Sequence, residues 1–147
     1  MKLKRNDIFT IAKEPYDLGG DKSNSKIEYL KWVEFIDNHP EEFIWKENTK
    51  NGKELLANID KVPDSFKERV LASLNKGACY REFDKKKGYY NINVGFNPVS
   101  RSVNIGFERV PKPEDLKNFL EMANYLDAML LRNGTEIIDE SYLESLS

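Results

Sequence analysis

The side chains best suited to catalysis are few, and they stand apart in this sequence. His39, the single histidine, lies at the expected end of a helix, where carbonyl groups would favour its charged form. Cys79, the single cysteine, falls on an expected strand and points inward with Phe83. No spacing ties either residue to a nucleophile–base pair, and catalytic groups act in such constellations. We therefore expect structural roles for both and no enzymatic activity, with catalysis as the weaker alternative.

The sequence also lacks the patterns that hold metals and cofactors. One histidine and one cysteine cannot form a zinc-finger-type tetrahedron, and no calcium-loop pattern occurs. Gly19-Gly20 lacks the lysine and hydroxyl of a phosphate-binding loop, and no nucleophile elbow is present. We expect no catalytic, metal or cofactor-binding residues, and folding that does not depend on a metal.

The charge balance argues against a nucleic-acid partner but leaves an acidic surface. The net charge is −2, without the basic excess that phosphate binding needs. Lys85–Lys87 beside Tyr89 and Tyr90 resembles a single-strand-binding pattern, yet three lysines in a hairpin indicate a soluble turn. Residues 111–147 hold eight acidic and three basic residues. They form either a solvated surface or a contact for a basic partner. The candidate contacts there are Glu136, Asp139 and Glu140.

A cytoplasmic location without membrane contact is the expected compartment. A lone cysteine cannot form an intramolecular disulfide, as is usual in reducing surroundings. The basic N-terminal residues lack the apolar run of a secretory signal. No stretch approaches the ~20 apolar residues that cross a bilayer.

Three segments with period-two alternation predict an antiparallel meander over residues 78–84, 89–97 and 102–109. The alternation places Tyr90, Ile92, Val94 and Phe96 on the buried face. Register counted from the two turns sets Glu82 opposite Asn91 and Asn91 opposite Glu108, in a row across the polar face. That face is either a recognition surface or plain solvent-facing sheet. Its candidate contact residues are Tyr80, Glu82, Asn91, Asn93, Asn104 and Glu108.

The remaining elements complete an α+β fold. Residues 1–24 read as an irregular segment, with Ile8–Ile11 as a short strand or surface clip, and residues 25–147 as a single α+β domain. N-terminal helices are expected from Ser25 and from Ser65, each with capping-box spacing. A long C-terminal helix over 111–133 is expected to pack on the apolar face of the meander. The predicted shared core is Ile92, Val94, Ile105, Phe107, Leu116, Phe119, Ala123 and Leu126.

The chain resembles small bacterial immunity proteins of contact-dependent inhibition toxin systems. The segments that carry the resemblance are Glu42–Gly52, Tyr89–Phe96, Phe119–Asp127 and Thr135–Asp139. The resemblance implies a non-enzymatic cytosolic protein that binds and blocks a cognate toxin domain. A basic nuclease is one candidate for that domain, because the acidic segment could face it.

Two functions therefore remain open. The first is a protein-binding module, an immunity protein that neutralises a cognate bacterial toxin. The alternative is a small enzyme or ligand-binding protein that uses the polar sheet face or a pocket under the long helix. A deep pocket with convergent polar groups would favour the alternative.

Overall fold

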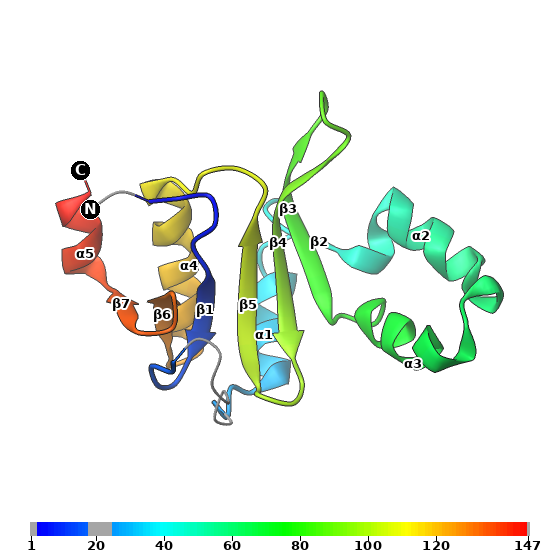
Figure 1. Cartoon of the computed structure of the whole chain (residues 1–147), viewed down its shortest axis with the longest axis horizontal. Coiled ribbons are helices and arrows are strands. Elements are labelled where there is room, and N and C mark those ends of the chain that lie inside the picture. Colours follow the sequence, from blue (N-terminus) through cyan, green and yellow to red (C-terminus); the bar gives the residue numbers. More distant parts are fainter. Residues whose placement is uncertain (1–2, 18–24, 147) are drawn as a thin grey trace.

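The alternating segments form the predicted meander in the computed structural model, which describes residues 3–17 and 25–146. The three strands are β3 (Ala78–Asp84), β4 (Tyr89–Asn97) and β5 (Ser102–Phe107), each antiparallel to the next. Within those described ranges the fold is α+β, with one seven-stranded antiparallel sheet and five α-helices (Figure 1).

Four shorter strands extend the meander on both sides. The order is β2-β3-β4-β5-β1-β6-β7, with β1 (Phe9–Ala12), β2 (Ile44–Trp45), β6 (Met129–Arg132) and β7 (Glu136–Ile138). Of the two alternatives for Ile8–Ile11, the short strand is present as β1 and the surface clip is not. The strand lies inside the sheet, between β5 and β6, and all four of its residues are buried. Gly19-Gly20, in the segment predicted to be irregular, lies outside the described residues.

One face of the sheet and two helices enclose the core. Helices α1 (Tyr29–Asp37) and α4 (Pro113–Tyr125) lie behind the strands in Figure 1 and touch through the rings of Phe35 and Tyr125. Phe119 of α4 packs edge-on against Phe107 of β5, with ring centres 6.1 Å apart. The predicted core is confirmed, because all eight of its residues are buried in a single cluster: Ile92, Val94, Ile105, Phe107, Leu116, Phe119, Ala123 and Leu126.

The long C-terminal helix was predicted too long. Helix α4 is the longest helix of the described chain, but it lies before β6 and β7 and ends at Tyr125. Asp127 turns the backbone with a φ of 55°, and the Lys13 ammonium donates to the carbonyl oxygens of Leu126 and Asp127. These contacts satisfy carbonyls that a helix end leaves unpaired. The chain then returns as β6 and β7, and it ends in the short helix α5 (Glu140–Ser145).

A helical arm stands beside the β2 edge of the sheet, as Figure 1 shows. It comprises η1 (Lys46–Asn48), α2 (Lys50–Ala57), η2 (Ile59–Lys61) and α3 (Asp64–Ser73). Helix α3 buries none of its residues, and α2 buries only Gly52. The apolar side chains of α3 are therefore largely exposed: Phe66 keeps 50% and Leu71 41% of its surface accessible. The arm is thus held mainly at its two ends rather than by an apolar core of its own.

The start of α2 contains an Asn-Gly pair, which is usually a turn signal. Here Gly52 lies in the first turn of α2, whose N-cap is Thr49. The Thr49 hydroxyl accepts from the Gly52 amide at 2.9 Å. A side chain at residue 52 would collide with the Lys46 carbonyl, so this position needs glycine for space rather than for turn geometry. The expected capping boxes at Ser25 and Ser65 are also wrong, because α1 and α3 begin at Tyr29 and Asp64 without side-chain caps.

Candidate functional site

An open groove of about 970 Å³ lies between the arm and the β3–β4 hairpin. Residues of η1 and α2 form one wall of the groove, and residues of strands β3 and β4 form the other. On the sheet side Tyr80 and Asn93 are paired across β3 and β4, and they alternate with the buried Cys79 and Val94. The groove therefore lies on the face of the sheet away from the core. Its arm wall comprises Lys46, Thr49, Lys50, Asn51, Gly52, Glu54 and Leu55.

Aromatic side chains form the sheet wall of this groove. The rings of Tyr80 and Tyr90 stack with centres 5.4 Å apart, and Phe83 meets Tyr90 edge-on at 5.0 Å. Phe83 and Tyr89 keep 51% and 43% of their surface exposed. The predicted inward positions of Phe83 and Tyr90 were therefore wrong. Glu82 has a φ of 61°, which interrupts the pleat and sets the residues beyond it beside Tyr80. A single-residue conformation of this kind leaves no trace in the alternation pattern.

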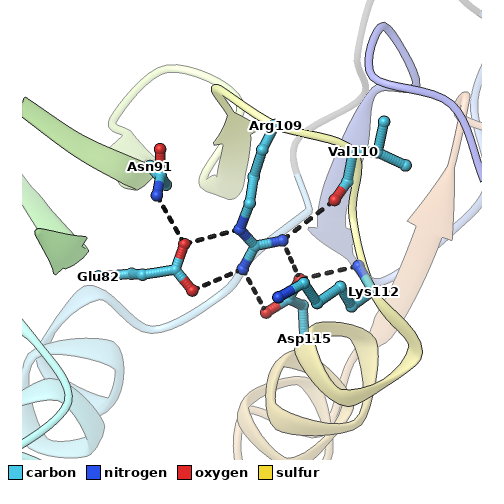
Figure 2. A network of polar contacts seen from close by, with 6 residues as sticks. All are labelled: Glu82, Asn91, Arg109, Val110, Lys112 and Asp115. Carbon is cyan, nitrogen blue, oxygen red and sulfur yellow. Dashed lines mark hydrogen bonds and ion pairs between the residues drawn. The ribbon is translucent and has the colours of Figure 1, made fainter. Parts of the chain in front are cut away.

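The predicted register across the meander is confirmed, but the predicted polar row is not. Asn91 Nδ2 donates to Glu82 at 2.8 Å, and the Glu108 amide donates to the Asn91 carbonyl at 2.7 Å. The Glu82 carboxylate accepts hydrogen bonds from Arg109, as Figure 2 shows, whereas Glu108 pairs with Arg5. Asn91 is buried, so it lies beneath the surface rather than on it.

Arg109 joins two carboxylates from separate elements, as Figure 2 shows. Its guanidinium donates to both oxygens of Glu82 and to both oxygens of Asp115, the latter at 2.7 and 3.0 Å. The hydrogen bonds from Arg109 lower the pKa of Glu82 to about 2, against desolvation. The Glu82 and Asp115 carboxylates raise the pKa of Arg109 above its usual range. The Arg109 cluster (Glu82, Asn91, Arg109, Asp115) thus fastens β3 to the start of α4, which makes it a structural element.

Three of the other four predicted contact residues on the sheet line the groove, and one does not. The three that line it are Tyr80, Asn93 and Glu108. Glu108 also forms an exposed ion pair with Arg5 at 3.2 Å. Asn104 lies on β5 between Gly95 and Thr10 and is not among the groove residues.

The acidic C-terminal residues lie at the opposite edge of the sheet, beside β7. Glu136 pairs with Arg132 at 3.1 Å, and Arg132 also binds Asp7 at 2.9 Å. Asp139 is the N-cap of α5 and accepts from the Tyr142 amide. Glu140 is exposed in the first turn of that helix. Two of the three predicted contacts therefore have internal partners.

His39 and Cys79 both serve the packing. His39 Nδ1 lies 2.6 Å from the carbonyl oxygen of Phe35, to which it donates, and the imidazole stacks on the Phe35 ring at 4.2 Å. Cys79 is fully buried. Burial raises the pKa of its thiol, as does the neighbouring Glu47 carboxylate to a smaller extent. The thiol is therefore held protonated, in the form that is a poor nucleophile.

Among residues 3–17 and 25–146 no group of three or more metal-ligating side chains comes together. The helices of the same ranges include none with the length and apolar character needed to span a bilayer. Comparison of the chain with protein-family models, curated proteins and solved structures gives no match. The groove and the Arg109 cluster must therefore be interpreted from their own chemistry.

Proposed function

We propose that this protein is a non-enzymatic binding module that neutralises a protein toxin by covering part of its surface. The open groove between the hairpin and α2, with exposed aromatic rings along it, is the observation that carries the proposal. Aromatic residues are enriched in protein–protein contacts, where they dominate the binding energy. Phe83 and Tyr89 have half-exposed rings without a role in the core, so they are available for such a contact.

The choice of a toxin as the partner rests on the resemblance to immunity proteins of contact-dependent inhibition systems. Two of the segments that carry it, Glu42–Gly52 and Tyr89–Phe96, supply residues to the two walls of the groove. The protein would act in the cytoplasm, where the single thiol of Cys79 stays reduced.

The state of the two candidate catalytic residues supports binding over catalysis. His39 donates to a backbone carbonyl and stacks on a ring, and the Cys79 thiol is held neutral by burial. Neither residue lines the groove. An enzyme that used this groove would have to draw on its tyrosines, lysines and carboxylates instead.

The experiment is to identify the neighbouring genes and to co-express this chain with any large toxin-like protein among their products, with growth and complex formation as readouts. We expect the toxin domain of such a protein to arrest growth alone and to form a stable complex with this protein, which restores growth. Absence of a complex, together with turnover of a small molecule that is lost in His39 or Cys79 variants, would move the protein into the enzyme class.

Binding of a small molecule is the second candidate, because the groove volume falls within the range of about 300–1,000 Å³ typical of ligand sites. A thermal-shift screen of metabolites tests it. A compound that raises the melting temperature of the native chain, but not of Tyr80→Ala, would favour this function over toxin binding.

A further inference from the structure

The groove offers an aromatic platform together with a lysine-rich border. The Tyr90 ring contacts both the Tyr80 ring and the Phe83 ring, so the three rings lie in one row. At the tip of the hairpin, Lys87 lies 5.6 Å from the centre of the Tyr89 ring. An apolar side chain that rested on the platform would gain ring contacts and displace water.

Lysines line the arm wall of the groove and continue just beyond its hairpin end. Among the lining residues Lys46 and Lys50 are balanced by Glu54 and Glu108, and Glu108 also pairs with Arg5. The turn directly before the lining residue Gly88 adds Lys85, Lys86 and Lys87, all exposed, against Asp84. The hairpin end of the groove is therefore net positive, and charge complementarity there favours an acidic occupant.

The acidic C-terminal residues are a weaker candidate for the partner contact than the groove. Glu136 is paired with Arg132, and Asp139 caps α5, so their charges are partly used within the molecule. The β7 edge on which they lie is the edge of the sheet farthest from the groove. The surface with exposed lysines and rings is therefore the better candidate for a partner contact.

We propose that the groove binds an acidic segment of the partner protein, with one aromatic or aliphatic side chain of that segment resting on Tyr80, Phe83 and Tyr90. The identification of the partner as a toxin rests on the proposed function above, whereas the charge and anchor of the segment rest on the groove alone. A nucleic acid fits less well, because Glu54 and Glu108 would repel a continuous run of phosphates and the chain is net negative. An acidic peptide can set its charges near the lysines and avoid the two carboxylates.

Selection of short random peptides displayed against the native protein tests the proposal without knowledge of the toxin. We expect the selected peptides to be rich in Asp and Glu and to share one aromatic or aliphatic residue. Their affinity should fall with added salt, as for charge-assisted contacts. Selection of basic peptides, or of none, would overturn the proposal, as would tighter binding of oligothymidylate than of the selected peptides.

Matched variants locate the binding surface. Replacement of Lys85, Lys86 and Lys87 by Glu should weaken the selected peptides about tenfold or more, which corresponds to losing charge-assisted contacts. The same charge change at the exposed Lys4, Lys61 and Lys117 is the control and should leave the affinity within about twofold.

The apolar anchor is tested in the same way. Phe83→Ser should weaken binding about tenfold, whereas Val99→Ser, at an exposed apolar residue in the β4–β5 turn, should not. Equal losses in test and control variants would refute the groove as the site. If the lysine and Phe83 variants still bound and neutralised the toxin as the native chain does, this inference would fail and the proposed function would stand. If acidic peptides were selected as expected but the native chain neutralised no toxin, the groove inference would stand and the proposed function would fail.

Discussion

Glu82 and Arg109 form a two-point ion pair, with Nε to Oε2 at 2.6 Å and Nη2 to Oε1 at 2.8 Å. The residues come from different elements, because Glu82 lies in β3 and Arg109 follows β5. The same guanidinium holds Asp115 at the start of α4. Arg109 therefore links strand β3 to the start of the helix α4, and Glu82 makes its part of this link with a positive φ of 61°.

Substitution of Glu82 by Gln should lower the free energy of unfolding by about 1–2 kcal/mol at neutral pH. This estimate lies around the lower limit of about 1.5 kcal/mol for hydrogen bonds to charged groups, because the Glu82 side chain is 39% exposed and solvent screens the pair. The folded-state pKa of Glu82 is about 2, below its usual 4.5, so the stabilisation is complete above the usual value and disappears as pH falls toward 2. Urea titrations of both proteins at neutral pH and near pH 2 measure the difference. Glu121→Gln, at an exposed position of α4, is the control, and a difference independent of pH would contradict the role of Glu82.

Truncation of Phe119 to Ala should destabilise the protein by about 3–5 kcal/mol, because the ring is buried between the sheet and the helices. Phe66→Ala in the arm removes the same atoms from a half-exposed site and should cost less than about 1 kcal/mol. Denaturant titration compares the two variants directly. Equal losses would mean that the arm is packed as tightly as the core.

The Cys79 thiol should resist alkylation in the native protein, because it is buried and its pKa is raised. Unfolding with guanidinium should bring its reactivity to that of a free thiol. A Cys79→Ser protein with Val99→Cys supplies the exposed comparison, since Val99 keeps 84% of its surface accessible. Mass spectrometry after iodoacetamide treatment measures both, and rapid modification of native Cys79 would show that the strand opens readily.

Asp139→Ala should cost about 1 kcal/mol through loss of the α5 cap, because its side chain accepts from the Tyr142 amide. Glu140→Ala, one residue further and exposed, should change stability by less than about 0.5 kcal/mol. Thermal melts distinguish the two. An equal effect of both substitutions would show that helix charge, rather than the cap, is the stabilising feature.

Chelation should leave the melting temperature unchanged, since the described parts of the chain gather no set of metal ligands. The measurement is a thermal melt with and without EDTA. A clear drop in the melting temperature on addition of EDTA would contradict this prediction and indicate a bound metal ion that stabilises the fold.

The β3–β5 meander was predictable because its information is local. Period-two alternation assigns Ile92, Val94, Ile105 and Phe107 to the core face, and short turns fix the register that sets Glu82 opposite Asn91. Both signals act between neighbouring strands and need no knowledge of distant segments.

The sequence by itself thus determined the meander, its register and the shared core residues of β4, β5 and α4. Only the tertiary structure decided the place of β1, because its strand partners lie about a hundred residues away along the chain. The end of α4 depends likewise on Lys13 and on the pairing of β6 with β1, because these contacts end the helix before residue 133, where the sequence predicts its end. The groove depends on the positive φ of Glu82 and on the placement of α2, and each is set by contacts between elements rather than by the residues nearby in sequence.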